Sequence, residues 1–422
     1  MRLCLRGQGS GGGVLCVLGV LHGERGQSKA LPLRLCEPLR QPALFNPVLC
    51  MSQPTSRLPL LDTLKGLACA AIVAHHLAFY GPMSDIALPL APDLMAWLYD
   101  YARMAVQVFL VLGGYLAAAS LAPEGAARFG PVGPQWLKRF VRLAAPYVVA
   151  LLVTVLVSAL VRPWMEHPSV PGDPDLAQLI THALLLHSLL DHESLSAGVW
   201  YVAIDFQLFA LSVLIFAAVR ALPSAWARQR AAQLGQAVVA AGVAASLWGF
   251  NRDASWDVWA LYFFGAYGLG MMVFWASRAP QAAGWVLAMA VLGGVGLALE
   301  FRARIALALV TALLMVWALR TPAVRQWRGI SALVRLGQMS YSVFLIHFAV
   351  CLLVNAVVSG LWPASPWINA LGMLLAFSLS IVAGQWLYRT VEQRTPTLPT
   401  MLRWQASLVA AGVLVQLGSN WG

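Results

Sequence analysis

Charged residues are scarce in this sequence, and their scarcity excludes most classes of protein. Only 11% of the 422 residues are Asp, Glu, Lys or Arg, 60% are apolar, and the mean hydropathy is +0.72. Soluble chains average about a quarter charged residues, so this chain has too few polar groups to cover a surface in water. Six cysteines are present, four of them before residue 51, without metal-ligand spacing. We therefore exclude a soluble enzyme, a disordered chain and a disulfide scaffold, and we expect no metal site.

The formal charge of +11 does not indicate a nucleic-acid partner. Dense basic runs with interleaved aromatic residues are missing, and Lys and Arg lie in short gaps between apolar segments. Such gaps are where charges that determine membrane topology are found. We therefore expect membrane lipid, and no nucleic acid, among the partners.

Long apolar runs predict an all-α polytopic membrane helix bundle of about ten transmembrane helices, because only helices or closed barrels satisfy their backbone in lipid. Two further runs have two interpretations each. Residues 179–190 form a re-entrant or an interfacial segment, and residues 404–418 form an eleventh span or a surface helix. The ten predicted spans are 59–80, 97–120, 143–161, 198–219, 235–250, 258–276, 283–299, 303–319, 339–361 and 367–388.

Composition divides the chain into three parts. Residues 1–50 are rich in Gly, Arg, Leu and Cys and differ from the rest. We interpret them as a mis-called start upstream of Met51, or as a disordered extension. Residues 51–396 form the membrane domain, and residues 397–422 form a C-terminal helix that is spanning or interfacial.

Basic residues predict the orientation. With a cytoplasmic N-terminus, fifteen Lys and Arg fall in the cytoplasmic loops and four in the outer loops, and the outer loops collect the acids. This bias follows the positive-inside rule and predicts a multi-pass protein of the cell inner (plasma) membrane. The longest and most polar outer loop, 162–198, is the predicted lid or acceptor-facing surface.

Ionisable groups inside a span are costly in lipid and mark functional sites. The first predicted span contains Asp62, Lys65, His75 and His76. Lys65 and His76 are eleven residues apart, which places them on one helix face about 16 Å apart along the axis. We expect them to line a shared water-filled passage. The alternative is an anchoring Lys and a structurally buried His.

Several motifs occur in an order that resembles acyltransferase family 3, a family of membrane-bound enzymes. Three positions depart from the family pattern: Lys65 replaces Arg, Gly113 replaces Ser and Asp205 replaces Glu. The similar segments are Leu61–Gly66 followed by His76, Val108–Tyr115, Lys138–Pro146, Trp200–Asp205, Ser340–His347 and Glu392.

The resemblance implies an integral O-acyltransferase that transfers an acyl group, expected to be acetyl, from cytoplasmic acyl-CoA. No permanently bound cofactor is expected, and acetyl-CoA is the expected cosubstrate. The acceptor is expected to be a hydroxyl of a carbohydrate, a glycan or a lipid-linked acceptor, as in polysaccharide modification. A multi-span transporter and a catalytically inactive acyltransferase-like subunit remain as alternatives.

Histidine titrates near neutral pH and is suited to deprotonating a hydroxyl, so His76 is the predicted general base. Asp205 is predicted to orient it, or else to satisfy a buried Tyr or Trp, and His347 is the second candidate base. Phosphates of CoA need cations. Lys65, Arg139 and Arg142 are predicted to bind them, although both arginines also fit as ordinary membrane anchors.

Overall fold

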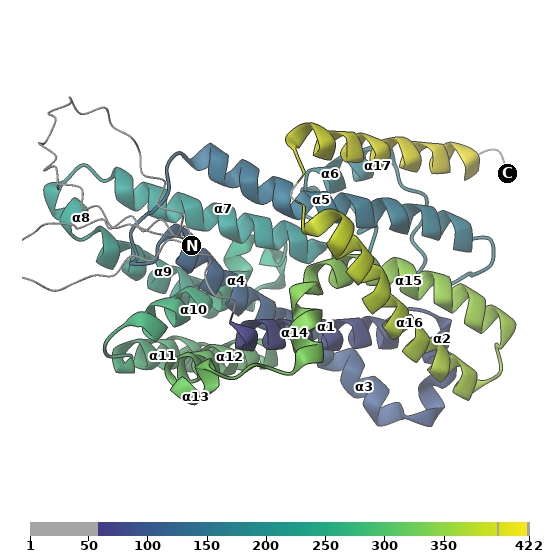
Figure 1. Cartoon of the computed structure of the whole chain (residues 1–422), viewed down its shortest axis with the longest axis horizontal. Coiled ribbons are helices and arrows are strands. Elements are labelled where there is room, and N and C mark those ends of the chain that lie inside the picture. Colours follow the sequence, from purple (N-terminus) through teal and green to yellow (C-terminus); the bar gives the residue numbers. More distant parts are fainter. Residues whose placement is uncertain (1–57, 395, 420–422) are drawn as a thin grey trace, which may run out of the picture. The chain divides into compact units, whose positions relative to one another are not determined.

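The computed structural model of the chain describes residues 58–394 and 396–419, and every regular element within them is a helix (Figure 1). The interpretations of residues 1–50 and of Met51 fall outside this range. Within it, ten helical segments are long and apolar enough to cross a bilayer. The prediction of an all-α polytopic bundle is therefore confirmed.

In residues 58–419, as far as they are described, eleven long helices form the bundle, and shorter helical turns connect them. Several begin with proline in the first turn, where its missing N–H costs nothing. The long helices are α1 (Pro59–Phe79), α4 (Val106–Leu121), α5 (Val132–Val161), α7 (Trp200–Ala221), α9 (Ala231–Trp248), α10 (Ala260–Arg278), α11 (Ala283–Leu299), α12 (Ala303–Arg320), α15 (Ser340–Leu361), α16 (Pro366–Leu387) and α17 (Leu398–Ser419). The shorter ones are α2 (Pro82–Ala87), η1 (Leu88–Leu90), α3 (Pro92–Asp100), η2 (Ala102–Ala105), α6 (Leu176–Ala183), α8 (Ala225–Gln229), η3 (Phe250–Arg252), η4 (Ala254–Trp256), α13 (Pro322–Arg325), α14 (Ser331–Gln338) and the π-helical turn η5 (Tyr388–Glu392).

Each predicted span contains a long helix, and the bounds differ most from the prediction in two places. The second span is interrupted, because the 3₁₀ turn η2 separates α3 from α4. The third helix, α5, begins eleven residues before the predicted residue 143. Helix α11 has the predicted bounds, but with 17 residues it is shorter than the ten candidate spans, and α17 with 22 residues is among those ten.

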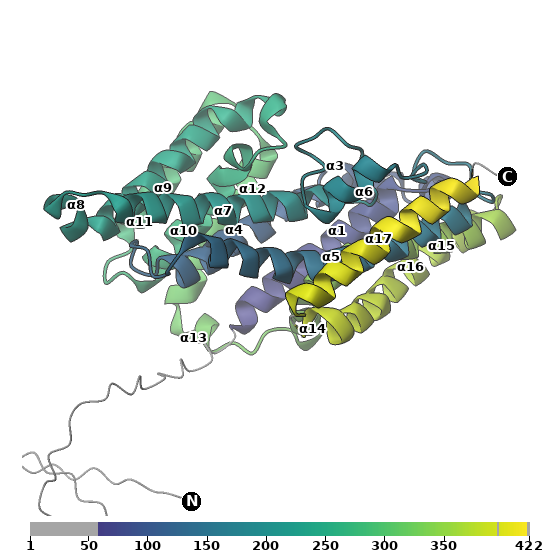
Figure 2. The ribbon, with the colours of Figure 1, turned by 90° about the horizontal axis from the view of Figure 1, so that it is seen from above.

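The C-terminal helix α17 lies along α5 and runs in the same direction (Figures 1 and 2). Met401 packs with Val141 near the start of α5. Leu414, thirteen residues or about 20 Å further on, borders a small cavity with Arg162, just beyond the end of α5. Helix α17 therefore extends along most of α5, as a spanning helix would.

Helices α1 and α15 are parallel and pack in a fixed register. The Cys69 thiol donates to the Ser340 carbonyl oxygen at 3.6 Å, and seven residues later His76 contacts His347. Seven residues are two helical turns, so the same faces of both helices remain in contact. We call the end at which α1, α5 and α15 begin the basic end, and the opposite end, which carries Arg162, the loop end.

Two glycines let α4 and α10 approach each other closely. A Cβ at Gly114 would overlap the Tyr267 carbonyl, and a Cβ at Gly270 would overlap the Val111 carbonyl. Small residues at a helix contact permit such backbone packing in membrane proteins. The close approach sets Tyr267 directly beside α4, next to the polar groups of α7 described below.

The segment between α5 and α7 turns back into the bundle. Its helix α6 has eight residues, too few to span, and Leu179 packs against Gly412 of α17. The Gln405 side chain donates to the Ala183 carbonyl at 2.7 Å, closer to the start of α17. Because the chain moves from Gly412 towards Gln405 along α17, α6 descends from the loop end, which fits the re-entrant interpretation of residues 179–190.

Candidate functional site

His76 and His347 form a direct pair inside the bundle. The Nδ1 atom of His76 lies 2.6 Å from the Nε2 atom of His347, and the ring planes differ by 6°. Their centroids are 4.8 Å apart, which exceeds the N···N distance by about the two ring radii. The rings therefore meet edge to edge in one plane, where nitrogen lone pairs point, rather than face to face.

The hydrogen bonds of this pair assign its protons. The Nδ1 atom of His347 lies 2.7 Å from the Phe344 carbonyl oxygen, which can only accept, so this nitrogen carries a hydrogen. In the neutral ring, Nε2 of His347 is then an acceptor for the Nδ1–H of His76. The remaining nitrogen of His76, Nε2, keeps its lone pair. This arrangement leaves His76 with one basic nitrogen available to a ligand.

A cavity of about 760 Å³ reaches the histidine pair from the loop end. His76 and Phe344 line its deep part, and exposed residues such as Glu193 line its outer part. Fourteen residues separate His347 from the end of α15, so the pair lies about 21 Å below that end. Residues of the predicted acceptor-facing loop also line this cavity: Pro168–Asp173, Asp175, Gln178 and Asp191–Gly198.

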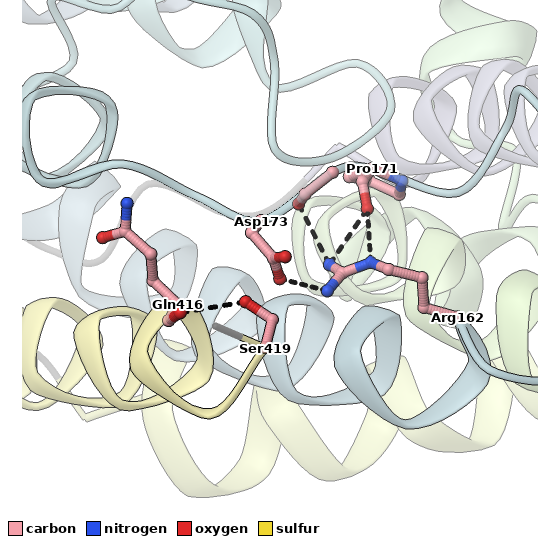
Figure 3. Close-up of polar contacts among 6 residues, drawn as sticks. Arg162, Pro171, Asp173, Gln416 and Ser419 are labelled. Atoms are coloured by element: carbon pink, nitrogen blue, oxygen red, sulfur yellow. Dashed lines mark hydrogen bonds and ion pairs between the residues drawn. The ribbon is translucent and has the colours of Figure 1, made fainter. Parts of the chain in front are cut away.

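Arg162 contacts a loop segment that lines this cavity, including Pro171 and Asp173 (Figure 3). Its guanidinium pairs with the Asp173 carboxylate and donates to the carbonyl oxygens of Pro171 and Gly172. Figure 3 also shows the last turn of α17, where Ser419 donates to the Gln416 carbonyl. The charge pair and the backbone contacts together fix the loop segment at the end of α5.

Buried histidines tie the two arms of the same loop together. The Leu195 N–H donates to Nε2 of His182 at 3.1 Å, and the His182 ring lies against His187 with centroids 4.1 Å apart. Burial, with the His187 charge as a smaller cause, lowers the pKa of His182 to about 3. Burial also lowers the pKa of His187 to about 4. Both rings are therefore neutral at pH 7.

Glycine is required where the loop meets the histidine pair. Gly198 has a φ of +75°, in the left-handed region that favours glycine. A Cβ there would lie 2.8 Å from Phe344 Cζ and 3.4 Å from His76 Cε1. The backbone at Gly198 therefore lies directly against the catalytic candidate, immediately before α7 begins.

Asp205 contacts Arg139 rather than His76. The Arg139 guanidinium donates to Asp205 Oδ2 at 2.5 Å, and Asp205 is 5% exposed. Tyr267, whose hydroxyl is buried and has no partner within the described residues, is one of the tyrosines nearest to this pair. The predicted contact between Asp205 and the His76 imidazole is therefore replaced by an ion pair on the side of α7 towards the basic end.

Lys65 also lies apart from the cavity that His76 lines. Its ammonium is 3.6 Å from the Asp62 carboxylate, one turn earlier on α1. Lys65 and Arg142 are both within electrostatic range of Glu392, which accepts a 2.6 Å hydrogen bond from Ser342. The cavity walls include neither Lys65 nor Arg142, so the expected passage shared by Lys65 and His76 is not this cavity.

The six predicted site residues thus fall into two groups. His76 lines the deep part of the cavity and contacts His347 behind it, whereas Lys65, Arg139, Arg142 and Asp205 lie towards the basic end. Sequence analysis missed Ser196 and Gly198 of the cavity wall, since a lone Ser or Gly in a loop carries no pattern. Among the described residues, no cluster of three or more His, Cys, Asp or Glu could hold a metal ion.

Comparisons with known proteins identify the family and one similar acyltransferase. Residues 58–389 match the model of acyltransferase family 3, described as an acyltransferase domain. The chain is similar to "Acyltransferase MdmB" of Streptomyces mycarofaciens, with 26% identity over 365 residues, which cover 80% of this chain and 91% of that protein. No solved structure matches.

Proposed function

Because this chain belongs to acyltransferase family 3, we propose that it is a membrane O-acyltransferase that moves an acyl group from acyl-CoA to a hydroxyl group. Acetyl is the proposed acyl group, and a carbohydrate, glycan or lipid-linked glycan is the proposed acceptor. The observation that carries the proposal is that His76, whose Nδ1 is hydrogen-bonded to His347, lines the deep part of a cavity open to the loop end.

His76 acts as the general base through Nε2. A hydroxyl is a poor nucleophile until a base begins to take its proton, and neutral imidazole suits that task near pH 7. His347 holds the His76 ring through the 2.6 Å hydrogen bond and fixes which nitrogen is basic. It is therefore a positioning residue in this proposal, rather than a second base.

The acyl donor binds towards the basic end. Arg142 and Lys65 lie near each other around Glu392, and Arg139 has a buried Nε with no partner within the described chain. Phosphates of CoA would pair with these cations. Lys65 and His76 are about 16 Å apart along α1, so the thioester must extend from this cationic group to the histidine pair.

The acceptor enters from the loop end. The cavity has polar loop residues at its mouth and aromatic rings, including Trp200 and Phe348, deeper inside. Hydroxyl-rich sugars combine polar edges with apolar faces, so both kinds of wall suit them. With the basic end in the cytoplasm of a plasma-membrane protein, donor and acceptor would approach from opposite faces.

A transfer assay tests this function and separates it from its alternatives. Purified protein in detergent is given acetyl-CoA labelled in the acetyl group and a panel of glycans, and alkali-labile label on the glycan is measured. The wild-type protein is expected to label at least one acceptor. CoA binding that depends on Arg142 without any product would favour an inactive subunit, and uptake of label into vesicles without ester formation would favour a transporter.

A further inference from the structure

We propose that the segment leading into α7 is the oxyanion-binding element of this site, formed by the Ser196 hydroxyl and the free backbone N–H groups at the start of α7. The inference rests on the proposed function and adds a catalytic group to it. Acyl transfer places a negative charge on the carbonyl oxygen as the nucleophile attacks. Hydrogen-bond donors aimed at that oxygen are commonly the largest single contribution to catalysis.

The backbone at the start of α7 supplies such donors. Within the described residues, no hydrogen bond of good geometry has the N–H group of Gly198, Val199 or Trp200 as its donor. The first N–H groups of a helix point out of its N-terminal end, and the helix dipole adds positive potential there. Gly198 and Trp200 both line the cavity, so these groups lie at its wall. Helix α7 has 22 residues, long enough for a developed dipole.

Ser196 places a buried side-chain hydroxyl at the same wall, independently of the backbone donors. Its side chain is 3% exposed, belongs to the wall of the same cavity, and its hydroxyl has no hydrogen-bond partner in the described part of the chain. A buried hydroxyl without a partner costs stability. Such a group is expected where a ligand supplies the missing partner, and here it is two residues from Gly198.

The geometry places these donors beside the base. A Cβ on Gly198 would lie 3.4 Å from Cε1 of His76, the ring carbon bonded to Nε2. A substrate hydroxyl that is hydrogen-bonded to Nε2 of His76 can therefore reach the carbonyl carbon of the acyl group. The oxygen of the same carbonyl group can at the same time contact the donors at the start of α7. This is the arrangement that an acyl-transfer site needs: nucleophile and base on one side, and oxyanion donors on the other.

The acyl group is transferred by addition of the acceptor to the thioester, followed by loss of the thiol. The acceptor oxygen forms a bond to the thioester carbon while its proton moves to Nε2 of His76. The carbonyl π electrons move onto oxygen, where the Ser196 hydroxyl and the α7 N–H groups stabilise the charge. When the carbonyl re-forms, the C–S bond breaks, and the thiolate takes the proton from His76. The products are the ester and free thiol.

The test compares Ser196→Ala with Ser194→Ala, since Ser194 is exposed and lines the same cavity. Transfer of labelled acetyl-CoA to the accepted glycan gives kcat and KM, and thermal unfolding in detergent gives the stability. For Ser196→Ala we expect kcat to fall about tenfold to hundredfold with KM nearly unchanged. Its melting temperature should stay equal or rise, because a hydroxyl without a partner is removed. Ser196→Thr, which keeps a hydroxyl, should retain more kcat than Ser196→Ala.

Two results would overturn the inference while the proposed function stands: equal kcat values for Ser196→Ala and Ser194→Ala, or a fall in kcat that accompanies a fall in melting temperature. Wild-type protein that transfers no acyl group to any acceptor would instead refute the proposed function, and the inference with it. The two failures are distinguished by the wild-type rate alone.

Discussion

His347 accepts a hydrogen bond from His76 in the plane of both rings, at 2.6 Å, and its own Nδ1–H donates to the Phe344 carbonyl oxygen at 2.7 Å. The chain of contacts runs from the backbone of α15 to the one free nitrogen of His76. In a Ser-His-Asp triad, the aspartate likewise holds the catalytic histidine in one tautomer through a hydrogen bond.

Replacing His347 should lower turnover without removing the base. In His347→Ala, His76 loses the acceptor that fixes its Nδ1–H, so both tautomers and other ring orientations become populated. We expect kcat to fall about a hundredfold while KM for the acceptor changes little. His347→Gln, whose side-chain oxygen can accept the same hydrogen bond, should recover part of the loss. Equal kcat values for the two variants would refute the positioning role.

Breaking the buried ion pair should destabilise the bundle. Asp205→Asn or Arg139→Gln leaves one charge without its partner. Because the Arg139 side chain is 26% exposed, we expect a loss below the about 3–5 kcal/mol that breaking a fully buried pair costs. The double variant removes both charges and should lose less than the sum of the two single losses. Unfolding of all four proteins in detergent measures this coupling. Strictly additive losses would show that the 2.5 Å contact contributes nothing.

A methyl group at Gly198 should impair both folding and turnover. Alanine there must adopt the unfavourable φ of +75° and contacts Phe344 and His76. The backbone conformation alone costs about 1–2 kcal/mol. Gly172→Ala is the matched control, because a Cβ at Gly172, in the same loop, meets nothing within 4 Å. Similar thermal stabilities for the two variants would contradict the close contact.

Acid should loosen the loop that walls the cavity. Burial lowers the pKa of His182 from its usual 6.5 to about 3 and that of His187 to about 4. Between these values and 6.5 the unfolded loop binds more protons than the folded loop, so its stability falls as pH falls through this window. Hydrogen exchange of residues 176–195, corrected for intrinsic rates, should be faster at pH 4.5 than at pH 7. In His187→Leu this pH dependence should be smaller, and an unchanged dependence would contradict the assignment.

Removing the contacts of Arg162 with the loop should weaken binding of the acceptor more than binding of the acyl donor. In Arg162→Gln the loop loses its pair with Asp173 and its bonds to Pro171 and Gly172. We expect a higher KM for the acceptor and little change for the acyl donor, which binds at the other end of the bundle. Arg252→Gln, at the exposed pair with Glu300, serves as control. An equal rise in KM for donor and acceptor would contradict the separation of the two sites.

The sequence alone predicted the helices well, because spanning segments are uniformly apolar and lipid leaves the backbone few other options. It also selected His76 and His347 separately. Their contact was not predictable, since it depends on the register between α1 and α15, which side-chain packing sets. Likewise Asp205 was identified as polar within a span, but its partner Arg139 lies on another helix, in a basic run that membrane topology explains equally well.

The most direct test of the central claim is the turnover of His76→Gln relative to His75→Gln. His75 is the adjacent histidine, lines the same cavity, and contacts the Leu98 carbonyl at 3.0 Å instead of His347. With labelled acetyl-CoA and an accepted glycan, His76→Gln is expected to lose at least about a hundredfold in kcat, whereas His75→Gln keeps most of its activity. If His76→Gln transfers the acyl group as fast as His75→Gln, His76 is not the base and the proposed mechanism is wrong.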